Sequence, residues 1–229
     1  MRWQVILQSL PYLLEGVRAT LLLSGTVLVT GTVLGLTWGL LRVFPVIALQ
    51  RFMTGVVEGV RSVPLLLQMF FIFFGLPALG VQTPVFLSAV LAMTLWMGAN
   101  LAEVIRGAIE SIPRGQLEAG VSTGLTYAQA MRSIILPQAL RRMLPPFVGL
   151  CTILIKDTSI AAIIGVFELT RAAQETIERT FRTFELYFVV LVMYFLICFP
   201  LTSLSRSLER RLGGPDHPRA TLATMAVSR

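Results

Sequence analysis

Two adjacent charges, Lys156 and Asp157, interrupt an otherwise apolar run in the second half of the chain. A charge at the centre of a bilayer costs at least about 2.5–3.5 kcal/mol on insertion scales, so such residues need partners or water. Neighbouring helical residues point about 100° apart, so these two cannot simply neutralise each other. We expect either a structural salt bridge to Arg61 or Glu103 of a neighbouring helix, or a polar site on the path of a solute.

Further polar residues accompany these charges in apolar surroundings. The hydroxyls of Thr158 and Ser159 can hydrogen-bond a solute or bond back to the preceding helical turn. Gln68 lies within one apolar segment, and Asn100 lies near the end of another. The candidate residues for a solute path are therefore Arg61, Gln68, Asn100, Glu103, Lys156, Asp157, Thr158 and Ser159.

The elements that must position these residues are membrane-spanning helices. The 229 residues are 55% hydrophobic and 14% charged, whereas soluble domains carry about 25% charged residues. A spanning helix needs about 20 mostly apolar residues. We predict an all-α membrane protein whose transmembrane domain covers residues 1–212. Its five expected spans are residues 19–41, 63–79, 84–104, 145–167 and 186–204.

Segments outside these spans have their own signals. Residues 1–16 have apolar side chains at helical spacing and are expected to lie at the membrane interface. Residues 168–185 are polar with balanced charges, which predicts an exterior loop or a short helix, and residues 213–229 are expected to be a disordered cytoplasmic tail. Within the first span, small-residue faces for close helix packing are provided by Gly25, Gly31, Gly35 and Gly39.

The most polar long stretch in the middle of the chain, residues 116–137, has the pattern of two short helices broken at a glycine. Gly124 is placed to end the first helix in a left-handed cap. Thr126 precedes Gln129 by three residues, the spacing of a capping box that begins a second helix. Pro137 disfavours helix at the preceding residue and marks the expected end. A helical hairpin of this size between spans can form a docking surface for a soluble partner.

The remaining composition argues against several kinds of site. The only histidine, His217, lies in the tail, so the body of the chain can build neither a histidine metal site nor a His-based triad. Cys151 and Cys198 lie inside apolar runs, which predicts small buried residues and no disulfide. The chain has no Gly-x-x-x-x-Gly-Lys-Ser/Thr loop, so we expect no ATP site of its own.

The net charge of +7 comes almost wholly from arginines scattered at span ends. This pattern indicates membrane topology and not nucleic-acid binding, because cytoplasmic segments carry the excess of basic residues. Five spans put the two ends on opposite sides. An outer N-terminus and a cytoplasmic C-terminus place most arginines inside, and they also place residues 116–137 in the cytoplasm.

The 116–137 hairpin resembles the EAA loop of bacterial ATP-binding-cassette importer permeases. The residues of that pattern occur at the required spacings as Glu118-Ala119, Gly124, Ile134 and Leu136-Pro137, whereas Gly120 replaces the usual second alanine. The resemblance implies a helix seated in a groove of an ATPase, with Gly124 allowing close backbone approach. Glu118 is then either a charge at a helix start or the partner of an ATPase arginine. The implied coupling residues are Glu118, Ala119, Gly120, Gly124, Leu125 and Pro137.

Permeases for polar amino acids resemble the chain over nearly its whole length, roughly residues 5–212. The supporting segments are residues 61–68, 103–107, 137–141 and 156–159, and Ser62 and Val63 depart from the usual Gly-Thr. The resemblance implies a type I permease of the bacterial inner membrane that pairs with itself or a sibling. It also implies two cytoplasmic ATPase subunits, which bind ATP and magnesium, and a periplasmic or extracellular solute-binding protein. The permease itself would be no enzyme and would hold no cofactor or metal.

We therefore interpret the chain as a permease subunit that translocates a polar amino acid. A zwitterion needs both signs of charge along its path, which Arg61, Glu103, Lys156 and Asp157 can supply. The alternatives are an ion channel or a self-contained secondary carrier, which usually has internal repeats, and a membrane enzyme, which needs clustered acid, base or metal groups. We find neither pattern. The sequence leaves open which amino acid or opine is carried, and whether the permease pair is a homodimer or a heterodimer.

Overall fold

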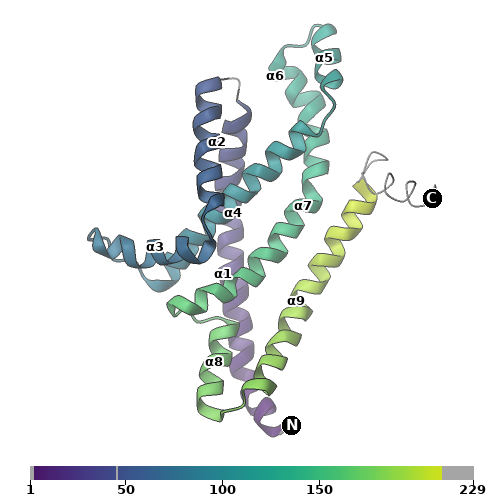
Figure 1. Ribbon diagram of the computed structural model, residues 1–229. Helices are drawn as coiled ribbons and strands as arrows, with labels where there is room; N and C mark the ends of the chain where they lie inside the picture. The colour runs from purple at the N-terminus through teal and green to yellow at the C-terminus, as the bar shows by residue number, and fades with distance from the viewer. Residues whose placement is uncertain (1–2, 45, 213–229) are drawn as a thin grey trace, which may run out of the picture.

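The computed structural model describes residues 3–44 and 46–212 (Figure 1). Every regular element of this part is helical, as the sequence predicts. The α-helices are α1 (Trp3–Val43), α2 (Ile47–Ser62), α3 (Leu65–Ala78), α4 (Val85–Glu110), α5 (Arg114–Ser122), α6 (Tyr127–Ala130), α7 (Leu136–Asp157), α8 (Leu169–Thr180) and α9 (Thr183–Leu212). A π-helical segment, Met131–Ile135, joins α6 to α7, and a 3₁₀ helix, Thr158–Ile164, follows α7. The expected disordered tail lies outside the described residues.

Four helical stretches of the described part are long and apolar enough to cross a membrane, and the bent pair α2–α3 makes a fifth candidate. The expected spans at residues 19–41 and 186–204 fall within α1 and α9, and the expected span at residues 84–104 falls within α4 except for residue 84, its N-cap. The expected span at residues 145–167 covers the second half of α7, the 3₁₀ helix and the turn that follows.

The expected span at residues 63–79 differs most from the structure. These residues form α3, whose 14 residues extend only about 21 Å, less than the roughly 30 Å of a bilayer core. α2 and α3 meet at 96°. The break follows from Pro64, because a proline disfavours helix at the residue before it, and Val63 is extended (φ −101°, ψ 130°). The second crossing is therefore a bent pair and not one straight helix.

α1 runs unbroken for 41 residues, so the segment expected at the membrane interface forms its first turns. This part of α1 is covered by α8, which lies where the sequence predicts an exterior loop or short helix. A Cβ on Gly16 would lie 2.9 Å from the Cα of Leu169 and from the Cβ of Ala172. The glycine thus allows close contact, and the start of α1 packs on α8 instead of lying free at the interface.

α1 and α4 pack closely along their length, through small residues on facing sides. Gly31, Gly35 and Gly39 of α1 face Met97, Leu101 and Ile105 of α4 in that order, and Gly98 of α4 receives Leu34. A Cβ on the three α1 glycines would lie 2.6, 2.7 and 2.8 Å from the facing side chains. The predicted packing face is confirmed for these glycines, whereas a Cβ on Gly25 would meet nothing within 4 Å.

Pro137 does not end the helix of the 116–137 hairpin, so that expectation is wrong. The chain passes from α6 through the π-helical segment into α7, and Pro137 occupies the first turn of α7. A proline cannot donate its hydrogen bond, and its ring collides with the carbonyl four residues earlier in a regular α-helix. The wider π turn just before Pro137 changes that hydrogen-bond pattern. The helix therefore continues where an ordinary α-helix would stop or kink.

We predict that Gly35→Ala destabilises the protein, because the new Cβ would lie 2.7 Å from the Cβ of Leu101. The helices would have to separate, and overpacking of this kind costs about 1–3 kcal/mol. Gly25→Ala on the same helix is the control and should leave stability unchanged or slightly higher, because alanine favours helix. Thermal unfolding of the purified variants in detergent measures both. Equal melting temperatures would contradict the packing role of Gly35.

Candidate functional site

The first helix of the 116–137 hairpin ends as predicted, because Gly124 adopts a left-handed conformation with φ of 90°. The N–H of Gly124 donates to the carbonyl of Val121 (3.0 Å), and the N–H of Leu125 donates to the carbonyl of Gly120 (3.2 Å). These two bonds define a Schellman cap. A Cβ added at Gly124 would meet nothing within 4 Å. The backbone conformation, and not lack of space, is what requires glycine in this chain.

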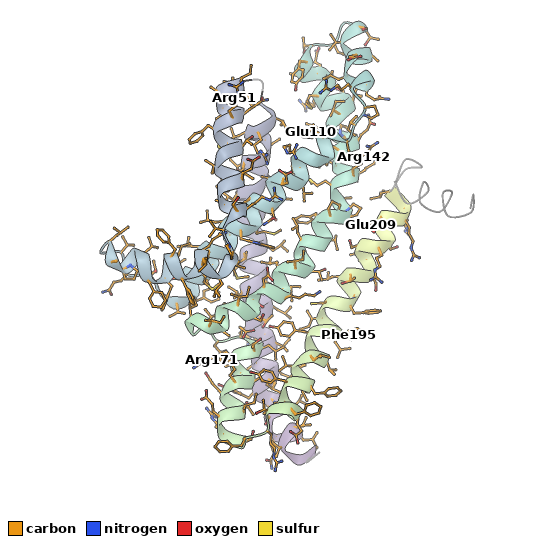
Figure 2. The ribbon with its side chains drawn as sticks, in the orientation of Figure 1. Arg51, Glu110, Arg142, Arg171, Phe195 and Glu209 are labelled. Carbon is orange, nitrogen blue, oxygen red and sulfur yellow. The ribbon has the colours of Figure 1, made fainter. Side chains whose placement is uncertain are left out.

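The predicted capping box at the start of the second hairpin helix is also confirmed. The hydroxyl of Thr126 accepts a hydrogen bond from the N–H of Gln129 (3.3 Å), and the side-chain oxygen of Gln129 accepts one from the N–H of Thr126 (2.8 Å). Arg142 of α7 donates to the carbonyl of Ser111, just after α4 (2.5 Å; Figure 2). The hairpin is therefore fastened at both its turn and its base.

The six candidate coupling residues occupy different sides of this hairpin. Glu118 and Ala119 are exposed, whereas Gly120 is buried against the second half. A Cβ on Gly120 would lie 2.7 Å from the Cδ1 of Ile134 and 3.2 Å from the Cβ of Ala130. Glycine at this position therefore allows α5 to lie closer to the π-helical segment than alanine would.

The other two coupling candidates, Leu125 and Pro137, lie beside the solvent-exposed surface of the hairpin. Leu125 is half-buried below the turn, and Pro137 is exposed on α7, beyond the π-helical segment. Val121 is 50% exposed and Tyr127 is 44% exposed, although both are large apolar side chains. Together with Glu118, they give the hairpin a surface with apolar side chains and one carboxylate that nothing within the described chain covers.

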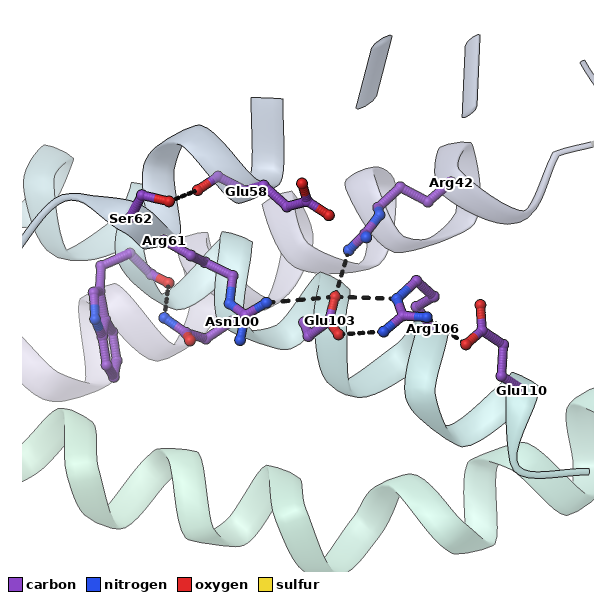
Figure 3. A network of polar contacts seen from close by, with 9 residues as sticks. Arg42, Glu58, Arg61, Ser62, Asn100, Glu103, Arg106 and Glu110 are labelled. Carbon is purple, nitrogen blue, oxygen red and sulfur yellow. Dashed lines mark hydrogen bonds and ion pairs between the residues drawn. The ribbon is translucent and has the colours of Figure 1, made fainter. Parts of the chain in front are cut away.

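A cluster of charges gathers α1, α2 and α4 around one carboxylate, that of Glu103 (Figure 3). Its oxygens lie 2.8 Å from Nη1 of Arg42, 3.5 Å from Nη1 of Arg61 and 3.1 Å from Nε of Arg106. Arg106 also pairs with Glu110, as the four-residue spacing on one helix favours. Glu103 therefore compensates arginines from three helices at once.

Arg42 is the member of this cluster that the sequence does not reveal as a site residue. Its side chain is only 2% exposed, although an arginine at the end of a span is read as a topology signal. The glycine contacts between α1 and α4 bring Arg42 to Glu103. The residues near Arg42 in the sequence do not predict this pairing. Its Nε has no hydrogen-bond partner within the described structure, so Glu103 is its main electrostatic compensation.

Gln68 and Asn100 are occupied with local backbone groups. The side-chain amide of Gln68 donates to the carbonyls of Val60 (2.8 Å) and Val63 (2.9 Å), which lie at the α2–α3 break. Asn100 donates to the carbonyl of Trp96 one turn earlier on α4 (2.8 Å). Gln68 therefore supports the bend, and Asn100 lies near Arg61 with its amide N–H committed to Trp96 (Figure 3).

Lys156 and Asp157 lie at the end of α7, where the helix tightens into the 3₁₀ segment. Neither forms an ion pair within residues 3–44 and 46–212, so of the two expected alternatives the salt bridge to Arg61 or Glu103 is not formed. Lys156 is exposed and Asp157 is half-buried. Their charges remain available to groups outside this chain.

The hydroxyls next to these charges hydrogen-bond to the backbone of the preceding helical turn. Thr158 donates to the carbonyl of Ile155 (2.7 Å), and Ser159 donates to the carbonyl of Lys156 (2.7 Å). Such bonds back to the preceding turn are the common use of serine and threonine in membrane helices. Thr158 is fully buried, so the structure does not present it to a solute.

Glu168 is a second buried charged residue that sequence reasoning missed. It is fully buried, and it caps α8 by accepting from the N–H of Arg171 (2.7 Å). Its other oxygen accepts from the hydroxyl of Tyr194 on α9 (2.9 Å). Burial raises the pKa of this carboxyl above its ordinary value, although these hydrogen bonds oppose the shift. The sequence signal that could have identified Glu168 is its position directly before an amphipathic helical stretch, where a glutamate can cap the helix.

Comparison with known proteins places these features in context. Residues 31–214 match the family described as "Binding-protein-dependent transport system inner membrane component". The glutamine transport system permease protein of Escherichia coli K12 is 40% identical over 212 residues, which cover 92% of this chain and 97% of that protein. The L-cystine transport system permease protein of Bacillus subtilis 168 is 39% identical, with 92% and 91% covered.

Solved structures agree with these relatives. A chain of an amino acid ABC transporter crystallised with histidines has a TM-score of 0.87 and 31% identity, covering 92% of this chain and 99% of that one. A chain of the MetNI methionine ABC transporter in an inward-facing conformation has a TM-score of 0.72 and 22% identity, covering 89% and 97%. The second comparison supports the fold alone.

We predict that Glu103→Gln strongly destabilises the protein, because it leaves the buried guanidinium of Arg42 without its counter-charge. Removing one partner of a buried ion pair costs about 3–5 kcal/mol. Glu110→Gln is the matched control on the same helix. Its side chain is 61% exposed and pairs with Arg106 alone among the described residues, so its loss should cost less than about 1 kcal/mol. Thermal unfolding in detergent measures this difference. Equal losses of stability in the two variants would show that Glu103 is not the main counter-charge of Arg42.

Proposed function

Because the chain belongs to the family of binding-protein-dependent transport system inner membrane components, we propose that it is the permease subunit of an ATP-driven importer of polar amino acids. The observation that carries this proposal is the 40% identity over 92% of the chain to a glutamine permease. The relatives named for L-cystine and arginine extend the class beyond glutamine. The apolar spanning helices agree with a multi-pass protein of the inner membrane.

The assembly that we propose has two cytoplasmic ATPase subunits, a second permease copy or sibling, and an external solute-binding protein. ATP and magnesium are bound by the ATPases, and this chain contributes no ATP site. Its N-terminus lies outside and its C-terminus in the cytoplasm, an orientation supported by the excess of arginines on the inner segments. The 116–137 hairpin then faces the compartment that holds ATP.

In this proposal, the solvent-exposed surface of the hairpin couples the permease to the ATPases. Val121 and Tyr127 supply exposed apolar area and Glu118 supplies a carboxylate, a composition that suits a groove with a basic rim. Closure of the two ATPases would draw the paired hairpins together and reopen the pore outward, as a rigid-body transition between two packings. α7 follows the hairpin without a break and ends at Lys156 and Asp157, so it links the docking surface to the polar segment.

In this proposal, the solute path is lined by charged side chains that have no ion-pair partner, or only a distant one, within the described chain. Lys156 and Asp157 have no ion pair within the described chain, and they offer both signs to a zwitterion. Arg61 is the most exposed of the three arginines around Glu103, at 37%, and makes the longest contact, 3.5 Å. Gln68 and Asn100 have a shaping role, since their donors bind backbone carbonyls.

We predict that Gly124→Asp abolishes solute-stimulated ATP hydrolysis by the complete transporter while leaving membrane insertion intact. A Cβ is strained at φ of 90°, and the new carboxylate lies on the docking turn. The measurement is ATPase activity of the purified transporter in liposomes with the loaded binding protein. Gly115→Ala is the control, because a Cβ there meets nothing within 4 Å and no left-handed φ is required. Full stimulation in Gly124→Asp would remove the docking role of the hairpin.

We also predict that Asp157→Asn lowers uptake by at least about tenfold while the subunits still assemble. The loss removes the negative half of the pair that would bind a zwitterion, and a tenfold change corresponds to about 1.4 kcal/mol. Ser159→Ala is the control and should transport nearly normally, since the serine hydroxyl bonds back to Lys156. Radiolabelled glutamine uptake and co-purification of the ATPase provide the two readouts. Normal uptake by Asp157→Asn would exclude this residue from the path.

A further inference from the structure

α8 begins at the depth of the spanning helices α1 and α9, and not beyond their ends. The N–H of Leu169 donates to the hydroxyl of Thr20 on α1 (3.1 Å). The hydroxyls of Thr170 on α8 and Tyr194 on α9 lie 3.3 Å apart. Within the expected span at residues 186–204, Tyr194 lies about 12 Å along the helix from the first residue and about 15 Å from the last. The start of α8 is therefore near the middle of that span.

From this point α8 runs back alongside the first turns of α9. Its 12 residues rise about 18 Å, and α9 begins at Thr183, close after its end. One buried apolar cluster joins α1, α8 and α9, and its members are Leu13, Leu169, Ala172, Ala173, Leu186 and Val190. In the orientation of the proposed function, α8 thus occupies the outer half of the membrane thickness.

The side of α8 opposite to this apolar cluster is polar throughout. At 100° per residue, the residues within about 60° of the direction opposite to Leu169 are Arg171, Gln174, Glu175 and Glu178. Nε of Arg171 lies 3.0 Å from Oε1 of Glu175, and neither side chain is fully buried. Glu178 is exposed. Figure 2 shows Arg171 projecting from α8 on the side away from α9.

This polar face fits neither lipid nor the centre of a protein interface. Charged residues at membrane depth almost always face the interior of a bundle or a water-filled cavity, and the centre of a protein–protein interface is depleted of charge. Apolar surface for lipid is present on the neighbouring helices at the same end, where Leu14 of α1 and Phe188 and Leu191 of α9 are exposed. Water is the surrounding that suits Arg171, Glu175 and Glu178.

We propose that the polar face of α8 borders water inside the outer half of the membrane and forms the entrance by which a polar amino acid reaches Lys156 and Asp157. α8 follows these two residues through the 3₁₀ helix, and Figure 1 shows it extending from the end of α7 along the first part of α1. Arg171 and Glu175 offer both signs of charge to a zwitterion. The solute and the outward direction rest on the proposed function.

The test is the reaction of single cysteines with a charged methanethiosulfonate reagent, in the complete transporter in lipid nanodiscs, where the reagent reaches both membrane faces. Cys151→Ala and Cys198→Ala first remove the native thiols of this chain. Gln174→Cys then places a thiol on the polar face. Leu191→Cys, on the exposed apolar face of α9, is the matched control. Mass spectrometry of the permease measures both rates.

The two cysteines lie at similar depth, because Gln174 is about 6 Å along α8 from Thr170 and Leu191 is about 4.5 Å along α9 from Tyr194. Gln174→Cys should react at least about tenfold faster than Leu191→Cys, since the reagent attacks the thiolate, which forms in contact with water. Both should react fully after unfolding in sodium dodecyl sulfate. In liposomes, modification of Gln174→Cys should remove more than half of its glutamine uptake.

Three outcomes would overturn the proposal. Equal rates in the two variants would show that the face of α8 is no wetter than a lipid-facing one. Reaction of Gln174→Cys only after unfolding would show that lipid or a second chain covers the face. Complete modification without loss of uptake would exclude the face from the solute path.

Solute-stimulated ATP hydrolysis by the cysteine-free transporter separates this proposal from the proposed function. If stimulation is normal and one of these three outcomes occurs, the inference about α8 alone fails. If the binding protein and its solute never stimulate hydrolysis, the proposed function itself is contradicted.

Discussion

Close contact between α1 and α4 is the constraint on which the rest of the structure depends. Lipid tails are as apolar as leucine, so helices in a membrane gain little by burying apolar surface and associate through close packing and polar contacts. Gly31, Gly35 and Gly39 supply that packing, because each leaves room for one side chain of α4. The same contact carries Arg42 to Glu103. α4 leads within a few residues to α5, so the position of the 116–137 hairpin follows from this contact too.

Features governed by a few neighbouring residues could be predicted from the sequence. The left-handed Gly124 and the capping box of Thr126 and Gln129 each depend on local hydrogen bonds, and both are present. The effects of prolines depend also on the helical segments around them, and the predictions at these positions were less accurate. Pro137 was expected to end a helix, but the π turn before it lets the helix continue. Residues 63–79 were expected to form one span, and instead Pro64 lies at a 96° bend between α2 and α3.

Charges in the membrane could be located from the sequence, but their partners could not. Glu103 and Arg61 were both candidates, and they meet at 3.5 Å. The most buried partner of Glu103 is Arg42, 61 residues away in the chain. That pairing depends on the three-dimensional register of α1 against α4. Lys156 and Asp157 show the converse, because a salt bridge to Arg61 or Glu103 was one of their two expected roles and the described structure does not form it.

α7 connects the 116–137 hairpin to the polar segment as a single helix with a different winding at each end. The π turn at Met131–Ile135 is wider than an α-helix, and the 3₁₀ turn at Thr158–Ile164 is tighter. Between them, the α-helix extends over 22 residues, about 33 Å. The weakest point of this stretch is Pro145 with its following proline, since each lacks a backbone donor. Ser205 of α9 binds the carbonyl of Pro145 at that point. α9 therefore contacts α7 at the point where prolines weaken its backbone hydrogen bonding, and the two helices support each other there.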